Sequence, residues 1–437
     1  MRTKPYRPKI NVITLGCSKN MVDSEVLMGQ LKANDFRVSH EREKNDSEIV
    51  IINTCGFIDR AKEESINTIL EYASIKNEGV IDKLYVTGCL SERYKSQLEE
   101  EIPEVDAYFG TMELPSLLHK LGANYKDELL GERFFITPQH YAYLKISEGC
   151  NRTCSFCAIP LMRGKHVSKP LEVVVAEAQT LVKRGVKEIM LIAQESTYYG
   201  LDIYKERKLA QLLMSLSSID GLGWIRLHYA YPSKFPTDIL DVISEKKNIC
   251  NYLDMPLQHV SNNMLRRMKR QISKEEIEDL IETIRKKIPA IGLRTTMLVG
   301  FPGETEDDVD ELISFLERMQ FDRVGVFTYS HEENTSAYKM RDAIPEKIKH
   351  ERAARVMAAQ ERISIALNQE KVGKTLKVLI DRREGNYFVG RTEYDSPEVD
   401  NEVLIDASTG SLQVGEFYMV NINGAEAFDL YATPVYS

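Results

Sequence analysis

The sequence predicts two α/β units with parallel sheets followed by a small all-β barrel, and three observations lead to this fold class. Short β-branched runs alternate with helical stretches as far as about residue 345, which indicates βαβ units. From about residue 372 short strands follow one another, broken by Glu-Gly, Thr-Gly and Asn-Gly pairs. A chain of 437 residues is also too long for a single core. We therefore expect domains at 1–125, 136–368 and 370–437.

The first predicted unit repeats one pattern three times. A short apolar strand ends in a cysteine at Cys17, at Cys55 and at Cys89, and a helical stretch follows each one. A lone cysteine is usually a small buried apolar residue. Because ligands bind at the carboxyl ends of parallel strands, however, three cysteines at that position would meet at one edge of the sheet. The pattern indicates a metal or cluster site.

The second predicted unit continues the alternation with six strands, at 142–149, 188–194, 224–231, 251–257, 294–300 and 323–330. Six βα units make a partial (β/α)6 barrel, whose active site lies at the carboxyl ends of its strands. Residues 347–372 read as a connecting helix with one apolar face for the barrel.

The third predicted unit has strands at 375–381, 386–393, 402–407 and 416–422. Short strands with frequent turns predict a small β-barrel, a fold often used to bind a substrate.

The strongest chemical signal is a CxxxCxxC motif, Cys150, Cys154 and Cys157, directly after the first strand of the second unit. Three thiolates hold three irons of a 4Fe–4S cluster and leave the fourth iron open. An open iron can chelate S-adenosylmethionine and deliver the electron that cleaves it to a 5′-deoxyadenosyl radical. The alternative is a zinc site, which needs four ligands. The chain has no second CxxC, and His166 is the nearest candidate for a fourth ligand.

Four segments together resemble the methylthiotransferase family of radical S-adenosylmethionine (radical SAM) enzymes: LGCSKNMVDSE, INTCGF, VTGCL and SEGCNRTCSFCAIPLMRG. The resemblance covers nearly the whole chain. It implies an N-terminal methylthiotransferase domain, a radical SAM partial barrel and a C-terminal TRAM β-barrel. It also implies two 4Fe–4S clusters: one on Cys150, Cys154 and Cys157 that makes the radical, and one on Cys17, Cys55 and Cys89 that supplies the sulfur. Two S-adenosylmethionine molecules would be used.

The resemblance also suggests cofactor contacts beyond the cysteines. Phe156 matches an aromatic residue of the superfamily signature. The turn of Gln194, Glu195 and Ser196 matches the place where the methionine amino group is held. Gly300, Gly303 and Glu304 match a turn that lets the backbone approach the adenosine. The alternative for both turns is an ordinary βα connection.

Other residues invite a structural interpretation. We expect Cys250 and Trp224 to be core residues. His228 and His259 lie at strand ends, where they would either face the pocket or form hydrogen bonds within the packing.

Two branches of the family differ in substrate. One modifies the β-carbon of an aspartate in small-ribosomal-subunit protein twelve, and the other modifies an adenosine in transfer RNA. Met162-Arg163-Gly164 and Ser18-Lys19-Asn20 resemble the first branch, because the second has Tyr-Thr-Arg-Gly and Gln-Met-Asn patterns there. From Lys371 onward six basic residues stand against eleven acidic ones, which suits a basic protein better than RNA. We therefore expect the protein substrate.

An alternative from another class is a non-catalytic iron–sulfur electron carrier with a nucleic-acid-binding barrel. This alternative explains the cysteines. It gives no function to the six βα units or to the turns at residues 194–196 and 300–304.

The expected partners follow from the chemistry: the basic ribosomal protein and an electron donor such as flavodoxin or ferredoxin, with no requirement for nucleic acid. The net charge of −9 argues against a generic nucleic-acid binder. No apolar run approaches the roughly 20 residues that span a bilayer, so we expect a cytoplasmic protein without membrane contact. The sequence alone assigns no residue to grip the substrate aspartate.

Overall fold

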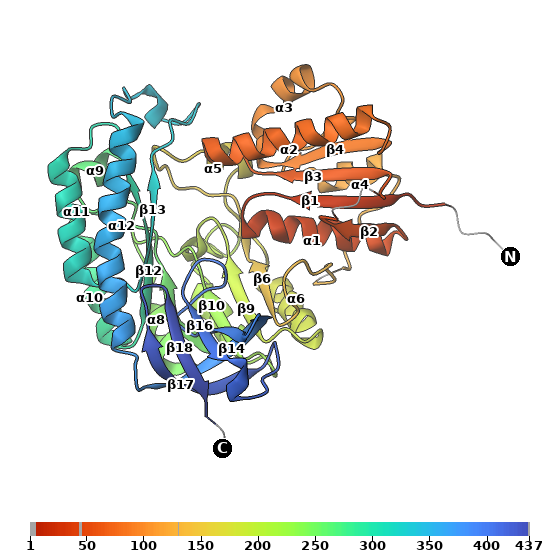
Figure 1. Ribbon diagram of the computed structural model, residues 1–437. Coiled ribbons are helices and arrows are strands. Elements are labelled where there is room, and N and C mark those ends of the chain that lie inside the picture. The colour runs from red at the N-terminus through yellow and green to blue at the C-terminus, as the bar shows by residue number, and fades with distance from the viewer. Residues whose placement is uncertain (1–5, 43–45, 130, 436–437) are drawn as a thin grey trace.

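The computed structural model describes residues 6–42, 46–129 and 131–435, and Figure 1 shows its three parts. The outer ends of the predicted first and third domains, residues 1–5 and 436–437, lie outside this range. Within it, no helix is both long enough and apolar enough to cross a membrane.

The N-terminal sheet is fully parallel, with apolar packing on both faces. Its strand order is β2 (Arg37–His40), β1 (Lys9–Thr14), β3 (Ile49–Thr54), β4 (Lys83–Gly88) and β5 (Ala107–Tyr108). The helices are α1 (Ser18–Ala33), α2 (Asp59–Asn77), α3 (Cys89–Glu101) and α4 (Leu114–Lys120). The sequence pattern missed β2 and β5, because edge strands of four and two residues carry no apolar run.

The second sheet is also parallel, and its strands lie side by side in chain order. They are β6 (Tyr141–Lys145), β9 (Glu188–Ile192), β10 (Trp224–Leu227), β11 (Ile249–Asp254), β12 (Gly292–Val299) and β13 (Arg323–Thr328). This order confirms the predicted partial barrel. The first connection also contains the hairpin of β7 (Ser147–Glu148) and β8 (Val167–Ser168), and the short helix α5 (Ile159–Arg163).

Helices cover the outer face of this sheet and form the largest core with it. They are α6 (Leu171–Lys183), α7 (Leu209–Ser217), α8 (Asp238–Glu245), α9 (Asn262–Arg267), α10 (Lys274–Lys287) and α11 (Glu306–Met319). Capping boxes at Ser273 and Thr305 begin α10 and α11. The connecting helix α12 (Glu346–Gln369) packs against β13 and α11, beside the second sheet in Figure 1.

The C-terminal strands form a closed barrel in the order β14 (Thr375–Glu384), β15 (Tyr387–Thr392), β16 (Glu402–Asp406), β18 (Asp429–Pro434) and β17 (Phe417–Ala425). The predicted small β-barrel is confirmed, with β18 as a fifth strand that the pattern missed. The short DLYATP sequence of β18 ends in a proline and carries little strand signal.

This C-terminal barrel is attached to the partial barrel of the second domain by apolar and ionic contacts. The ring of Trp224, at the start of β10, meets that of Phe417 edge-on at 4.8 Å between centroids. The loop between β15 and β16, residues 393–401, reaches the inner face of the second sheet, where Asp395 pairs with Arg323 at 2.6 Å. These contacts place the C-terminal barrel near the amino ends of the strands, opposite the cysteine motif.

Candidate active site

The three N-terminal cysteines share one corner of their sheet. Cys17 directly precedes α1, Cys55 follows β3, and Cys89 begins α3. A Cβ atom added at Gly16 would lie 2.9 Å from the Sγ atom of Cys55, so the first loop presses on the second. Burial raises the pKa of Cys89 to about 12; Arg163 opposes this rise, and the nearby Cys17 and Cys55 add to it. The predicted convergence at the strand ends is present.

The second trio lies in the loop after β6 and β7. Burial raises the pKa of Cys150 to about 11 and that of Cys157 to about 12, and the neighbouring Cys154 raises both further. Arg270 donates a hydrogen bond from Nη1 to the Sγ atom of Cys154 at 3.1 Å. This buried cation is suited to stabilising negative charge on the sulfur.

The two trios adjoin. Cys89 of the first packs in one small apolar cluster with Ala158, the residue after Cys157, and with Met162. Arg163, at the end of α5, donates from Nε to the Sγ atom of Cys89 at 3.3 Å. The loop that carries one trio therefore contacts a cysteine of the other.

Arg163 belongs to a buried polar network between the N-terminal domain and the barrel. Its guanidinium pairs with Asp23 at 2.6 Å and with Glu148 at 3.3 Å, and Lys145 pairs with the same two carboxylates. In the sequence, Arg163 is notable only as part of the Met-Arg-Gly pattern that distinguishes the two branches. No spacing rule reveals its contact with Cys89, because 74 residues separate them in the chain.

The available ligands suit clusters better than a zinc ion. Among the described side chains, no group of three or more His, Cys, Asp or Glu is placed to hold a single metal ion. Each thiolate of a cubane binds a different iron, so cluster ligands lie farther apart than the ligands of one ion. The nearest zinc candidate, His166, is engaged with the Ser168 hydroxyl at 3.0 Å. Three converging thiols without a fourth ligand fit a 4Fe–4S cluster with one open iron.

The turn after β9 offers one free acceptor. Gln194 donates from Nε2 to Glu148 at 3.0 Å, while its buried Oε1 atom has no partner among the described atoms. An ammonium group would satisfy this oxygen. Glu195 and Ser196 are already engaged, the first with Arg152 at 2.6 Å and the second with the backbone oxygen of His228. They shape the turn, and Gln194 is the residue that fits a ligand.

The turn after β12 is tightly packed against the protein's own side chains. Gly300 has a φ of +76°, and a Cβ atom there would lie 2.4 Å from Cγ of Lys349. Gly303 has a φ of +85° and faces Arg267 in the same way. Glu304 accepts from the Gly300 amide at 2.7 Å and from Arg352 of α12 at 2.8 Å. Turn geometry and packing therefore both require the two glycines.

The remaining candidates have packing roles. Phe156 packs against the apolar cluster that contains Phe301. His228 forms a hydrogen bond with Ser396 of the C-terminal barrel at 3.1 Å, and burial with nearby cations holds its pKa well below the usual value. His259 accepts from two backbone amides through Nδ1. Cys250 and Trp224 are buried in one cluster, as expected.

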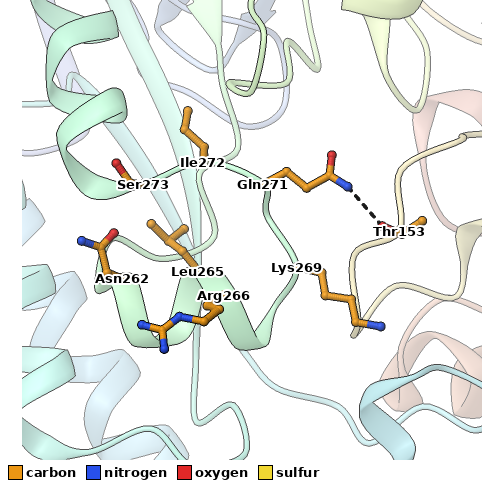
Figure 2. Close-up of a pocket in the computed structure, with 8 residues that line it drawn as sticks. All are labelled: Thr153, Asn262, Leu265, Arg266, Lys269, Gln271, Ile272 and Ser273. Atoms are coloured by element: carbon orange, nitrogen blue, oxygen red, sulfur yellow. Dashed lines mark hydrogen bonds between the residues drawn. The ribbon is translucent and has the colours of Figure 1, made fainter.

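A hollow of about 620 Å³ lies beside the second cysteine trio (Figure 2). Thr153 of the cysteine loop forms one wall, and Gln271 reaches across to it at 3.5 Å. Exposed Arg266 and Lys269 also line the hollow. Beneath it, the Ser155 amide donates to the backbone oxygen of Met268 at 3.0 Å. A basic surface thus rests directly on the cysteine loop.

Comparison with known families divides the chain in three. Residues 144–316 match the radical SAM superfamily, residues 9–110 match Uncharacterized protein family UPF0004, and residues 372–435 match the TRAM domain. Among solved structures, the radical S-adenosylmethionine methyltransferase TsrM from Kitasatospora setae superposes with a TM-score of 0.53 at 14% identity. That match covers 74% of this chain and 72% of TsrM, and at this identity it supports the fold alone.

Curated relatives are far more similar. A protein of Cytophaga hutchinsonii named ribosomal protein uS12 methylthiotransferase RimO is 58% identical over 425 residues, 97% of either chain. One of the same name from Phocaeicola vulgatus is 54% identical over 428 residues, 98% of this chain and 99% of that one. Two thiol trios, one of which contacts the loop of the other, on a partial radical SAM barrel with a TRAM domain, agree with this similarity. The chain therefore belongs to the RimO family of methylthiotransferases, within the radical SAM superfamily.

Proposed function

We propose that this protein transfers a methylthio group to the β-carbon of an aspartate in ribosomal protein uS12. The reaction would use two S-adenosylmethionine molecules and two 4Fe–4S clusters. The observation that carries the proposal is the contact between the N-terminal trio and the loop that carries the second trio, where Cys89 packs against Ala158, in a chain of the RimO family. A radical site and a sulfur site must be adjacent for a short-lived carbon radical to be captured.

In this proposal the radical-forming cluster is held by Cys150, Cys154 and Cys157, and the sulfur-supplying cluster by Cys17, Cys55 and Cys89. When bound, the first supplies the electron that cleaves S-adenosylmethionine and the second supplies the methylthio group. The chain's own residues orient and stabilise the cluster ligands. Arg270 donates a hydrogen bond to a sulfur of the radical-forming trio, and Arg163 donates one to a sulfur of the N-terminal trio. The free Oε1 atom of Gln194 would accept from the methionine ammonium.

The test is anaerobic. The protein is reconstituted with iron and sulfide, reduced, and mixed with S-adenosylmethionine and a peptide that copies the uS12 aspartate loop. We expect a methylthio mass gain on the aspartate. Replacing Cys154 with Ala should abolish formation of 5′-deoxyadenosine, and normal cleavage by that variant would contradict the radical assignment.

Two other functions remain distinguishable in the same assay. A transfer-RNA enzyme would form 5′-deoxyadenosine, leave the peptide unchanged and modify an adenosine instead. A non-catalytic electron carrier would form no 5′-deoxyadenosine at all. The names of the relatives favour uS12 over both.

The electron donor is a further part of the proposal. The surface around the hollow in Figure 2 would dock an acidic carrier protein such as flavodoxin, because Arg266 and Lys269 are exposed there. Neither side chain forms an ion pair with any residue of the described ranges, so both charges are available to an acidic partner. The same charges would repel the basic protein substrate.

Reversing this charge should slow electron transfer. We expect the double substitution R266E/K269E to lower the rate of cluster reduction by flavodoxin hydroquinone about tenfold or more at low salt. Reduction by dithionite should be unchanged. The matched control is K246E/K247E, which changes two exposed lysines next to α8. Equal rates for the two variants in stopped-flow measurements would contradict this docking surface.

A further inference from the structure

Lys19 is a buried cation without an anion. It lies in the first turn of α1, two residues after Cys17, and only 7% of its surface is exposed. Its Nζ atom lies 3.1 Å from the centre of the Tyr229 ring, just beyond the end of β10. No carboxylate of the described residues pairs with it. Removing an ammonium from water without an ionic partner is costly, so this position calls for an anion.

Three other buried cations of this region are paired with carboxylates. Lys145 and Arg163 share the carboxylates of Asp23 and Glu148. Arg152 pairs with Glu195. Lys19 differs from these three cations in having no counter-charge among the described residues.

Lys19 has neighbours on both the N-terminal domain and the barrel. The next residue, Asn20, accepts a hydrogen bond from Arg163, the same side chain that donates to Cys89. On the other side, the charge of Lys19 helps to lower the pKa of His228, the residue after β10, to which burial, Arg226 and Arg294 contribute more. Lys19 thus lies between the N-terminal trio and the carboxyl ends of the barrel strands.

Tyr229 is held in place to face this ammonium. Its φ of +59° lies in the left-handed region, which is rare for an aromatic residue. Its amide donates to Asp254 at 3.2 Å, and its carbonyl accepts from the Ser196 amide at 3.1 Å. Strained backbone of this kind is typical of functional sites. The ring therefore covers one face of the ammonium.

We infer that Lys19 binds the side-chain carboxylate of the substrate aspartate and so selects an acidic residue for modification. This inference rests on the proposed function and names the group that recognises its substrate. The shared chemistry is an ammonium–carboxylate pair, and two carboxylates enter this region: that of the substrate and that of S-adenosylmethionine. The lack of a protein anion near Lys19 means that the pair forms only when a ligand is bound.

The experiment compares holoenzymes with Lys19→Met and Lys32→Met. Methionine keeps the unbranched shape and removes the charge. Lys32 is the matched control, because it lies on the same helix and also faces an aromatic ring, Phe134 at 5.6 Å, but at an exposed position. Binding of an aspartate peptide, binding of S-adenosylmethionine, peptide-free cofactor cleavage and methylthio transfer are measured for each variant.

We expect Lys19→Met to weaken peptide binding and lower kcat/KM about 100-fold, as when a desolvated charge pair loses one member. Cofactor binding and peptide-free cleavage should stay at the wild-type level, and Lys32→Met should behave as wild type throughout. Weaker cofactor binding in Lys19→Met would assign the lysine to the methionine carboxylate and overturn the inference. An unchanged peptide affinity would overturn it as well.

A peptide with asparagine in place of aspartate completes the cycle. The wild type should bind the aspartate peptide much more tightly, whereas Lys19→Met should bind both about equally. Because affinity is measured separately from turnover, a wild type that binds peptide and transfers no methylthio group would contradict the proposed function alone. If the wild type and Lys19→Met prefer the aspartate peptide over the asparagine peptide to the same extent, only the role of Lys19 is contradicted.

Discussion

Individual side chains show which positions the chemistry depends on and which the packing depends on. Arg163 and Arg270 each donate a hydrogen bond to one thiol, of Cys89 and Cys154 respectively, so each trio has one buried guanidinium. Gly300 and Gly303 lie in a turn predicted to approach the cofactor, yet their open sides are filled by Lys349 and Arg267. The two glycines therefore have a packing role in addition to the cofactor contact that the sequence suggests.

Arg163 should tune the N-terminal cluster. Replacing it with Gln removes a positive charge and a hydrogen bond to sulfur, so the reduction potential of that cluster should fall. Methylthio transfer should drop about 10- to 100-fold, as is usual when a group behind a metal ligand is lost. The potential is read by electron paramagnetic resonance in a background where Cys150, Cys154 and Cys157 are replaced by Ala. Arg270→Gln should leave the potential unchanged in this background, and an equal shift would contradict the assignment.

Gly300→Ala should destabilise the fold, because the new methyl group would meet Lys349 at 2.4 Å and the φ of +76° disfavours alanine. The expected loss is about 1–3 kcal/mol more than for Gly373→Ala. Gly373 is the matched control: its φ is +84° and no atom lies within 4 Å of its added Cβ. Denaturant unfolding compares the two, and equal losses would show that the packing against α12 does not matter.

At the scale of elements, the loop of residues 393–401 joins the C-terminal barrel to the radical SAM barrel. Asp395 pairs with Arg323 of β13, and Asp400 pairs with Arg294 of β12 and accepts from the Tyr252 hydroxyl at 2.8 Å. Several acidic residues that the sequence analysis counted toward attraction of a basic substrate are therefore used inside the molecule. The loop therefore anchors the C-terminal barrel to the radical SAM barrel, and fewer of its acidic residues are available to attract a basic substrate.

Replacing Asp395 with Asn should weaken this anchor. The substitution leaves the buried Arg323 without its charge partner, and breaking a buried pair from one side costs about 3–5 kcal/mol. Glu384→Gln is the control, because this side chain is 67% exposed and its change should stay within about 0.5 kcal/mol. Unfolding by denaturant measures both, and similar small effects would mean that the loop contributes little to stability.

At the scale of the whole molecule, the attachment of the C-terminal barrel is ionic and should depend on pH. Burial alone would raise the pKa of Asp381, but Arg391 and His140 together hold it below the usual value. The pKa of Asp395 is lowered in the same way, because the effect of burial is outweighed by the charges of Arg323 and Lys371. Carboxyl groups with lowered pKa values stabilise the folded state above their unfolded pKa, near 3.9, and this contribution is lost as the pH falls through the folded values.

Asp400 works in the opposite direction, since burial raises its pKa above the usual value in spite of Arg294. Its protonation on acidification therefore relieves part of the loss. We expect a net decrease of the unfolding temperature below about pH 4, and Asp395→Asn should show a smaller decrease than the wild type. A pH dependence that is the same in both proteins would contradict the assignment to this pair.

The order of elements in the radical SAM barrel was predictable because each parallel strand is buried and apolar and is followed by a helix. The strand ends at Cys17, Cys55 and Cys89 were predictable for the same reason. The edge strands β2 and β5 were not, because they are too short to carry a pattern, and β18 was missed because pairing across a closed barrel stabilises a weak strand sequence.

The sequence by itself determined the three kinds of fold and the grouping of the six cysteines, because strand–helix alternation and motif spacing are local properties of the chain. Only the tertiary structure decided that Arg163 contacts Cys89, that loop 393–401 enters the barrel, and that Lys19 faces Tyr229 without an anion. These contacts join residues from different domains that are 74, 72 and 210 positions apart. They depend on how whole domains pack, and packing between distant segments leaves no periodic signal in the sequence.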